Sequence, residues 1–477
     1  MFKNNFWNST LIFGLGFLFI RSISFLLLPI YTNILTPEEM GVIFIFITFL
    51  AFMNALYTFG MDSALLKYYQ SESNILFTSF VSIFVFALPI SLMIYINGHY
   101  LEAILFQDIL STDSFILKNG MWILFAIIIL ILDTVSSRAM TLIRILNMPK
   151  YYLIIAMLNI FSSLILNIYF LYFVEPSWKL DGVILSMFIV SIIQCISLMP
   201  IVIKKLNSWQ FNFLIFKKML CFAWPFFPAT IFFIIIELSD RIMIEKMLST
   251  HDVGLYGTGY KLGALMLMIV RGFNLNWQPY YLKRGRELNS TVIENFGYIG
   301  NIVLLSFILI SASVSSLWPY LITIKLGAFT IIGENFVAGG SIIPYILISY
   351  TFYGFFILQM PSIYLKEKQN WAPILWGLGA SINILGNIIL LPKWGYIGAA
   401  ISTLLAYSSM SIILLYKNRE WLWIPYNFKL LFCAIIISFV QYYLITYMMF
   451  NIIITMALYI IIMISLIYYI QIKNKLL

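Results

Sequence analysis

Long apolar stretches separated by short polar loops run along almost the entire chain, and this pattern constrains the fold more than any other feature. Hydrophobic residues occupy 62% of the 477 positions and charged residues only 10%. A helix that crosses a bilayer needs about 20 apolar residues, and the chain contains roughly fourteen such stretches. We therefore predict an all-α polytopic membrane protein without a large soluble domain. The stretches are 10–35, 41–60, 76–97, 120–142, 151–174, 181–203, 220–239, 254–280, 293–318, 339–364, 371–391, 395–416, 428–449 and 451–472.

Lysine and arginine gather in one set of alternate loops and near both ends of the chain. This set includes Arg138, Arg144, Lys150, Lys204, Lys205, Lys217 and Lys218, whereas the opposite loops hold Lys118, Lys179, Arg241, Lys246, Lys325 and Lys393. Loops rich in lysine and arginine stay in the cytoplasm. The pattern predicts an even number of spans with both termini cytoplasmic. The net charge of +9 then reflects topology, and no feature indicates nucleic-acid binding.

The residue types that usually carry catalysis or bind metals are scarce. Cys195, Cys221 and Cys433 lie in apolar segments without CxxC spacing, so we predict buried packing residues with neither disulfides nor a metal. The only histidines, His99 and His251, lie in predicted outer loops. No phosphate-binding GxxxxGK[ST] loop is present. We predict no catalytic residues and no cofactor, so transport energy has to come from an ion gradient, the membrane potential or a downstream reaction.

Two motifs recur at nearly the same distance along the chain. The segment that begins Thr36-Pro37-Glu38 is echoed by Ser249-Thr250-His251, and the segment that begins at Trp178 is echoed at Trp394. Six spans separate the copies, so both copies enter the membrane in the same direction. We predict two parallel six-helix lobes, 1–203 and 220–416, joined by an amphipathic cytoplasmic linker, 204–219, and followed by two additional helices, 417–477.

Five charged residues interrupt the apolar stretches: Arg21, Asp133, Glu237, Lys261 and Arg271. A charge in mid-membrane costs about 3 kcal/mol on insertion scales and usually marks a functional site. Three of these five are cations, which favours an anionic cargo or a network of structural ion pairs.

Arg271 heads a polar stripe with Asn274 and Gln278 on one helix face, which we predict lines a cavity. Arg21 belongs to the other predicted lobe, so both arginines are able to face one cavity, with Lys261 as a helper. Arginine binds phosphate oxygens through two parallel hydrogen bonds. The alternative is that the arginines pair with Asp133 or Glu237 as structural ties.

The embedded acids have two possible roles, which are to couple transport to a proton or a sodium ion or to hold the cations. Asp133 heads a stripe with Ser137 and Thr141, and Glu237 begins a second stripe with Asp240 and Arg241. For Asp240 and Arg241 we favour a local charge pair at the membrane interface.

Two smaller polar features are expected to be structural. Asp62 is expected to be the N-cap of a short helix. Asn383 and Asn387 are expected to join helices.

At these residues the chain resembles the Wzx-like polysaccharide flippases of the multidrug/oligosaccharidyl-lipid/polysaccharide exporter superfamily. The resemblance covers nearly the whole chain and implies two lobes that rock around a cavity. Similarity to the lipid II flippase branch implies that Arg21 and Arg271 contact a lipid diphosphate. The segments that carry the resemblance are Arg21 to Gly41, Gly60-Met61-Asp62-Ser63-Ala64, Ser239-Asp240-Arg241, Val253-Gly254-Leu255-Tyr256, Trp277-Gln278-Pro279 and Gly395 to Ala400.

The resemblance leads to a specific functional hypothesis. The chain is expected to flip undecaprenyl-diphosphate-linked oligosaccharide units across the bacterial cytoplasmic membrane for O-antigen, capsule or exopolysaccharide assembly, by alternating access and with a polysaccharide polymerase as a possible partner. The alternatives are a multidrug/cation antiporter of the same superfamily and a membrane glycan polymerase. An antiporter is expected to have an acidic cavity, and a polymerase a long external loop.

Overall fold

The computed structural model describes residues 25–72, 74–106, 114–206, 209–224, 226–322, 324–326, 329–448 and 450–476. Within these ranges twelve helices or helix groups are long and apolar enough to cross a membrane, or thirteen when α10 (Phe213–Ala223) and α11 (Phe226–Met247) count as one bent span. The prediction of an all-α polytopic membrane fold is confirmed. The first predicted span, 10–35, is described only from residue 25 onward, including the short helix Phe25–Ile34.

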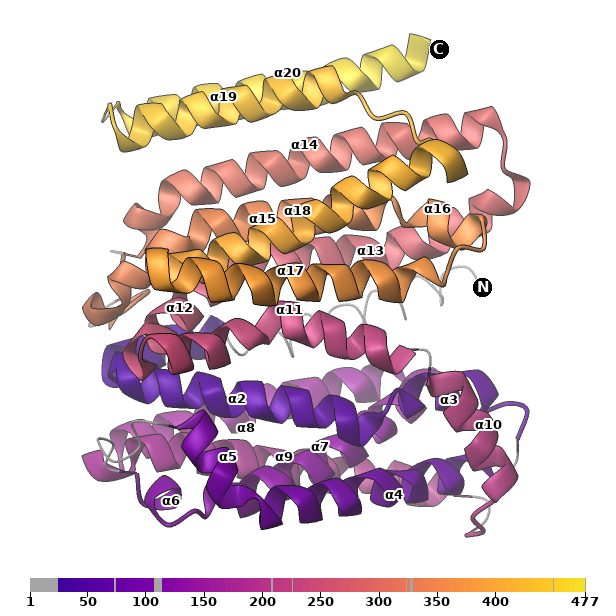
Figure 1. Ribbon diagram of the computed structural model, residues 1–477, viewed down its shortest axis with the longest axis vertical. Coiled ribbons are helices and arrows are strands. Elements are labelled where there is room, and N and C mark those ends of the chain that lie inside the picture. Colours follow the sequence, from indigo (N-terminus) through magenta and orange to yellow (C-terminus); the bar gives the residue numbers. More distant parts are fainter. Residues whose placement is uncertain are drawn as a thin grey trace. The chain divides into compact units, whose positions relative to one another are not determined.

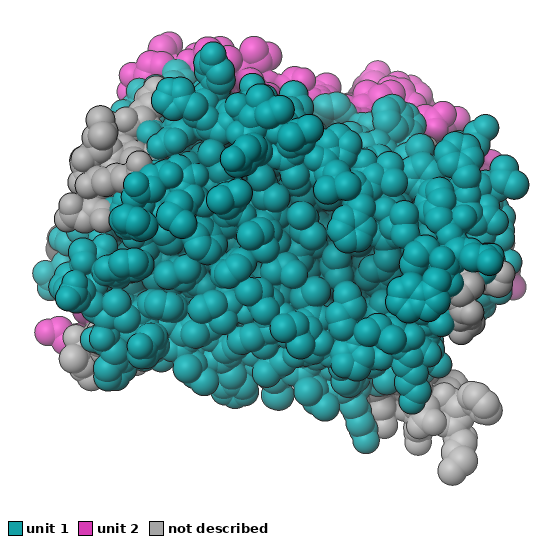
Figure 2. Space-filling view, turned by 90° about the horizontal axis from the view of Figure 1, so that it is seen from below, with its two compact units in different colours: residues 1–234, 241–254, 332–335 teal, residues 235–240, 255–331, 336–477 magenta. Residues whose placement is uncertain are grey.

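The chain forms two compact units, which are coloured separately in Figure 2. Unit 1 contains residues 1–234, 241–254 and 332–335, and in it the spans α2, α4, α7, α8 and α9 pack against one another. Its helices are α2 (Pro37–Thr58), α3 (Met61–Tyr68), α4 (Ile75–Ile96), α5 (Gly98–Leu105), α6 (Phe115–Lys118), α7 (Trp122–Ile145), α8 (Pro149–Tyr172), η2 (Pro176–Trp178), α9 (Lys179–Lys205) and α10 (Phe213–Ala223).

Unit 2 contains residues 235–240, 255–331 and 336–477. It is built around α14, α15, α17 and α18, with α19 and α20 packed on α14 (Figure 1). The remaining elements are α11 (Phe226–Met247) and α12 (Thr250–Gly263), which contribute to both units, and α13 (Leu265–Arg284), η3 (Gly285–Glu287), α14 (Ser290–Leu321), β1 (Lys325–Leu326), β2 (Phe329–Thr330), η4 (Glu334–Ile342), α15 (Ile343–Leu358), α16 (Met360–Leu365), α17 (Trp371–Trp394), α18 (Tyr396–Trp421), α19 (Phe428–Thr446) and α20 (Ile452–Leu476).

The first repeated motif builds the same helix start twice. Thr36 caps α2 in a capping box, in which its hydroxyl accepts from the Glu39 amide and its own amide donates to the Glu39 carboxylate. At the start of α12, the Ser249 hydroxyl accepts from the Asp252 amide and donates to the Asp252 carboxylate at 2.7 Å. In both copies the hydroxyl accepts from the amide three positions later, which satisfies a backbone group that the first helical turn leaves open, and in the first copy the acid also accepts from a backbone amide.

The two copies also touch each other, and the contact is reciprocal. A Cβ atom on Gly41 would lie 2.1 Å from the Thr250 carbonyl oxygen, and one on Gly254 would lie 1.9 Å from the Pro37 carbonyl oxygen. Gly41 is equivalent to Gly254 in the repeat, and Pro37 is equivalent to Thr250. The beginnings of α2 and α12 therefore cross through a local pseudo-twofold contact that only glycine permits at both positions.

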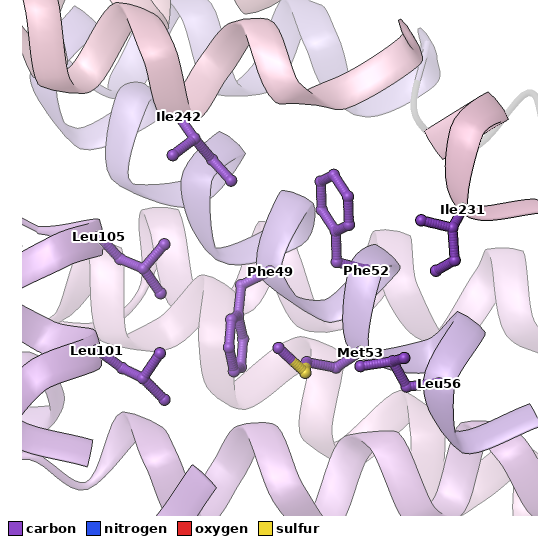
Figure 3. Close-up of a pocket in the computed structure, with 8 residues that line it drawn as sticks. All are labelled: Phe49, Phe52, Met53, Leu56, Leu101, Leu105, Ile231 and Ile242. Atoms are coloured by element: carbon purple, nitrogen blue, oxygen red, sulfur yellow. The ribbon is translucent and has the colours of Figure 1, made fainter. Parts of the chain in front are cut away.

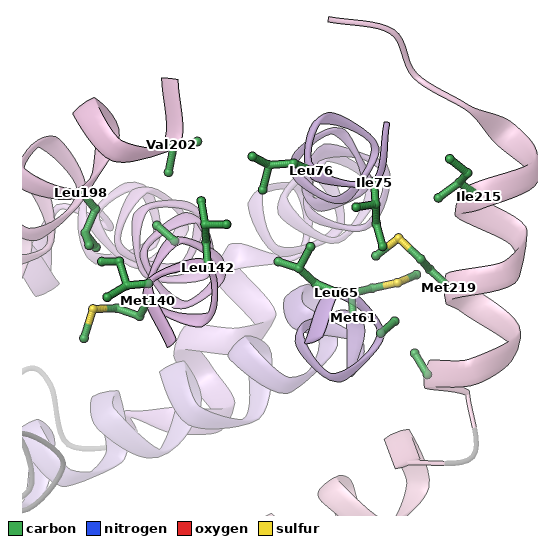
Figure 4. Packing of buried hydrophobic residues seen from close by; sticks show 14 of the residues in the cluster. Met61, Leu65, Ile75, Leu76, Met140, Leu142, Leu198, Val202, Ile215 and Met219 are labelled. Carbon is green, nitrogen blue, oxygen red and sulfur yellow. The ribbon is translucent and has the colours of Figure 1, made fainter. Parts of the chain in front are cut away.

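One end of unit 1 is closed by two short helices. The chain reverses between α2 and α3 through Phe59 (φ 45°) and Gly60 (φ 69°), a left-handed pair that needs glycine at its second position. The turn points Met61 and Leu65 of α3 toward Ile215 and Met219 of α10 (Figure 4), in a buried apolar cluster with the ends of α4, α7 and α9.

The prediction that all three cysteines are buried is correct only for Cys195. Cys221 on α10 and Cys433 on α19 are exposed. Both belong to apolar helices that turn one face away from the protein core. Because both faces of such a helix are apolar, the sequence does not reveal which face is buried.

Candidate functional site

Arg271 and Glu237, two of the embedded charges, come together in unit 2. Arg271 lies on α13 and Glu237 on α11, and the two side chains interact electrostatically. The Arg271 guanidinium also hydrogen bonds the Tyr353 hydroxyl. The Glu237 carboxylate, 7% exposed, accepts a hydrogen bond from Tyr350 at 2.9 Å and another from Tyr407. We name Arg271, Glu237, Tyr350, Tyr353 and Tyr407 the Arg271 cluster.

The Arg271 cluster has a chemical consequence for anion binding. A buried carboxylate is costly unless it is paired or hydrogen bonded, and Glu237 has two tyrosine donors as well as the electrostatic interaction with Arg271. Tyr350 is in turn fixed by Tyr260, whose hydroxyl lies 2.6 Å from its own. Glu237 therefore has hydrogen-bond donors besides the guanidinium and would stay hydrogen bonded if the guanidinium turned to another anion.

The other residues predicted to line the cavity are not part of the Arg271 cluster. Asn274 and Gln278 follow Arg271 on α13 and are partly buried, as is Lys261 near the end of α12. A break at Gly263–Ala264 separates α12 from α13, so Lys261 and Arg271 belong to different helices. Arg21 lies outside the described residues.

Asp240 lies at the centre of a second polar group. Its carboxylate is fully buried and accepts from Tyr256 at 2.5 Å, from Asn387 at 2.7 Å and from Thr403 at 2.9 Å. Asn383 joins the group through Asn387, at 3.3 Å. Asp240 therefore lies inside the helix bundle, where α17 and α18 bring polar side chains to it. The expectation that Asn383 and Asn387 join helices is consistent with these bonds.

The Asp240 group has the chemistry of a site for a small hard cation. Among the described residues no three or more His, Cys, Asp and Glu side chains gather at one point. The Asp240 group instead offers one carboxylate with hydroxyl and amide oxygens, and Asn387 Oδ1 is buried there without a donor in the described part of the chain. Oxygen-only donor sets of low charge suit sodium-like ions better than transition metals.

The predicted stripe on α7 does not form one site. Asp133 accepts from Ser191 on α9 at 2.6 Å, Ser137 donates to Asp62 at 2.6 Å, and Thr141 accepts from Arg144 at 2.8 Å. Each polar side chain of the stripe thus has a different partner.

A buried ion pair in unit 1 was not predicted from the sequence. Arg138 is fully buried in α7, and its Nε lies 2.7 Å from Asp62 Oδ1 on α3. Its Nη1 donates to the Ser79 hydroxyl on α4 at 2.8 Å. Arg138 is therefore not a loop cation, and Asp62 is not an N-cap, because Gly60 occupies that position without a side-chain bond. The pair fastens α3 to α7.

We expect Arg138→Met to destabilise unit 1 by about 2–3 kcal/mol, since the Asp62 carboxylate, which is 25% exposed, loses its buried counter-ion. The double variant Asp62→Leu/Arg138→Met removes both charges and should recover most of that loss. Thermal unfolding of the purified chain in detergent measures both effects. A double variant as unstable as Arg138→Met alone would contradict the importance of the pair.

Unit 1 also contains an apolar cavity of about 360 Å³, between α2, α5 and α11 (Figure 3). Every side chain that lines it is hydrocarbon or thioether, so it accommodates hydrocarbon and offers nothing to a diphosphate. The lining residues are Phe49, Phe52, Met53, Leu56, Leu101, Leu105, Ile231 and Ile242.

Comparison with known families identifies the chain. Residues 6–281 match the family described as polysaccharide biosynthesis protein, which is more than half of the sequence. The chain belongs to this family. The matched region includes both Glu237 and Arg271. A search of curated proteins finds no match.

Solved structures of transporters share the fold. A lipid II flippase, MurJ, in an inward closed conformation has a TM-score of 0.66 at 16% identity, over 97% of this chain and 98% of that one. A multidrug resistance MATE family transporter of the MOP superfamily in an inward-facing conformation has a TM-score of 0.60 at 13% identity, over 84% and 94%. An outward-facing MATE structure has a TM-score of 0.57 at 13% identity, over 86% and 94%. At these identities the likeness establishes a shared fold, in a chain that belongs to the polysaccharide biosynthesis protein family.

Proposed function

We propose that the chain is a flippase, not an enzyme, and that it moves undecaprenyl-diphosphate-linked oligosaccharide units from the inner to the outer leaflet of a bacterial cytoplasmic membrane. The observation that carries the proposal is the Arg271 cluster, a partly buried guanidinium beside an internal carboxylate that has other hydrogen-bond donors, in a polysaccharide biosynthesis protein. A lipid diphosphate presents paired anionic oxygens that match the guanidinium fork.

In this proposal the two ends of the cargo meet different parts of the protein. Arg271, with Arg21 and Lys261, neutralises the diphosphate, while Asn274 and Gln278 line its path. The isoprenoid tail remains in hydrocarbon, and the apolar cavity of unit 1 has room for a segment of it, since a cavity of about 150 Å³ already holds benzene. The related fold has been solved in inward- and outward-facing forms, which supports alternating access.

The decisive experiment follows the lipid-linked glycan in cells. In a deletion strain, we expect undecaprenyl-linked units to accumulate on the cytoplasmic leaflet and surface polysaccharide to disappear, and the wild-type gene should restore both. A deletion strain with normal surface polysaccharide and no accumulated lipid-linked glycan would reject the proposal. The sugar composition of the accumulated lipid would also assign the product to O-antigen, capsule or another exopolysaccharide.

The Asp240 group supports a second element of the proposal, coupling to a cation. We expect sodium, compared with choline at equal ionic strength, to raise the melting temperature of the purified chain, because an ion that binds only the folded state stabilises it. Asp240→Asn should abolish the sodium effect, whereas Asp133→Asn, which alters a carboxylate bonded to Ser191, should leave it intact. An unchanged sodium response in Asp240→Asn would exclude this group, and a response lost instead in Glu237→Gln or Asp133→Asn would move the site there.

A multidrug/cation antiporter remains the second candidate, because Asp133, Glu237 and Asp240 are acids inside the bundle and the MATE fold is shared. An antiporter should extrude a fluorescent organic cation from inverted vesicles. The flippase proposal instead predicts no such extrusion.

A further inference from the structure

Helix α10 differs from the spans around it in length and direction. It has 11 residues and is therefore about 16 Å long, roughly half the thickness of the hydrocarbon core. It is bent by 48° from α11 and crosses the ends of α3 and α4, which it contacts (Figure 1). By itself α10 is too short to span the bilayer, and it lies against the end of the unit 1 bundle.

The two faces of α10 are both apolar, but only one is buried. Ile215 and Met219 pack into the cluster with α3 (Figure 4), and Phe216 belongs to the same cluster. On the outward face, Phe213 is 65% and Leu214 is 76% exposed, and Trp209, just before the helix, is 68% exposed. Side chains of this size are unfavourable in contact with water, whereas aromatic and leucine side chains are enriched where a helix enters the interface of a membrane.

Lysines follow these apolar residues at helical spacing. Lys217 and Lys218 lie one turn after Phe213 and Leu214 and are exposed, and Lys204 and Lys205 at the end of α9 are exposed as well. The Lys218 ammonium contacts the Glu72 carboxylate at 2.7 Å. The positive-inside rule explains lysines in this region, but it does not explain large apolar side chains exposed beside them.

We propose that the outward face of α10 binds anionic phospholipid in the cytoplasmic leaflet. Phe213, Leu214 and Trp209 enter the boundary between headgroups and acyl chains, and Lys217 and Lys218, with Lys204 and Lys205 nearby, contact the headgroup phosphates. Apolar burial combined with lysine–phosphate attraction is the usual basis of such binding. The surface acts on the bilayer itself and does not depend on the cargo.

The depth of α10 is measurable because Cys221 is exposed on this helix. In a Cys195→Ser/Cys433→Ser variant, a nitroxide label on Cys221 reports collisions with dissolved oxygen and with a water-soluble nickel chelate. In vesicles of phosphatidylcholine and phosphatidylglycerol, we expect the Cys221 label to collide more often with oxygen than with the nickel chelate. A label on Cys433 of α19, in the matched Cys195→Ser/Cys221→Ser variant, should show the same preference. A Cys221 label that collides mainly with the nickel chelate would overturn the proposal.

Lipid selectivity tests the lysines separately. Spin-labelled phosphatidylglycerol should associate with the wild-type chain more strongly than spin-labelled phosphatidylcholine, and Lys217→Gln/Lys218→Gln should reduce that preference about fivefold. Lys393→Gln, which removes an exposed lysine at the end of α17, is the matched control and should have no effect. Equal binding of the two lipids by the wild-type chain, or an unchanged preference in the double variant, would overturn the proposal.

Discussion

Gly41→Ala and Gly254→Ala are each expected to destabilise the protein by about 3 kcal/mol, although the added group is a single methyl. The new Cβ atom would stand 2.1 Å from the Thr250 carbonyl oxygen in the first variant and 1.9 Å from the Pro37 carbonyl oxygen in the second. These obstacles are backbone atoms, so no change of rotamer relieves the clash. The beginnings of α2 and α12 have to move apart, which opens the packing around both helix caps.

Gly272→Ala provides the matched control for this prediction. Gly272 also lies inside a helix, α13, but a Cβ atom there meets nothing within 4 Å. Alanine is a better helix former than glycine, so this variant should be neutral or more stable by about 0.5–1 kcal/mol. Melting temperatures in detergent compare the three variants. If Gly41→Ala had the same melting temperature as Gly272→Ala, the beginnings of α2 and α12 would not be in the contact described.

The sequence repeat was informative because it records packing as well as topology. The offset between Thr36 and Ser249 aligns a hydroxyl, an acid and a glycine. The hydroxyl caps the helix in both copies, and the glycine admits the backbone of the other copy. The acid accepts from the backbone amide of Thr36 in the first copy and from the Ser249 hydroxyl in the second. Hydropathy predicted the spans well for a similar physical reason, since a bilayer imposes one length and one composition on every helix that crosses it.

Side-chain partners were much harder to predict. The apolar stretch 120–142 contained Arg138, but the residue lay near the predicted end of that stretch, where a cation is ordinarily solvated. Its ion pair with Asp62 depends on the reversal at Phe59–Gly60, which turns α3 back toward α7. The tyrosines around Glu237 were missed for another reason: tyrosine is common at membrane interfaces, so Tyr350 and Tyr407 carried no distinct signal before α15 and α18 placed them on the carboxylate.

Because Glu237 interacts with Arg271, a single substitution of Arg271 does not by itself test its role in export. Arg271→Gln alone would leave the buried Glu237 carboxylate without its cation, and a loss of export could then reflect poor folding. We expect the single variant to be both less abundant in the membrane and inactive. Arg271→Gln/Glu237→Gln removes the two opposite charges together and should restore the amount of folded protein.

The double variant separates a structural tie from a phosphate-binding group. If Arg271 only ties α13 to α11, restored folding should restore export of surface glycan. If Arg271 binds the diphosphate, export should remain about a hundredfold below wild type, because hydrogen bonds from a charged group contribute about 1.5–3 kcal/mol each. Arg271→Lys keeps the charge but loses the paired guanidinium donors, so it should retain an intermediate level of export. Surface glycan measured at matched protein levels decides the outcome, and wild-type export by the double variant would reject the binding role of Arg271.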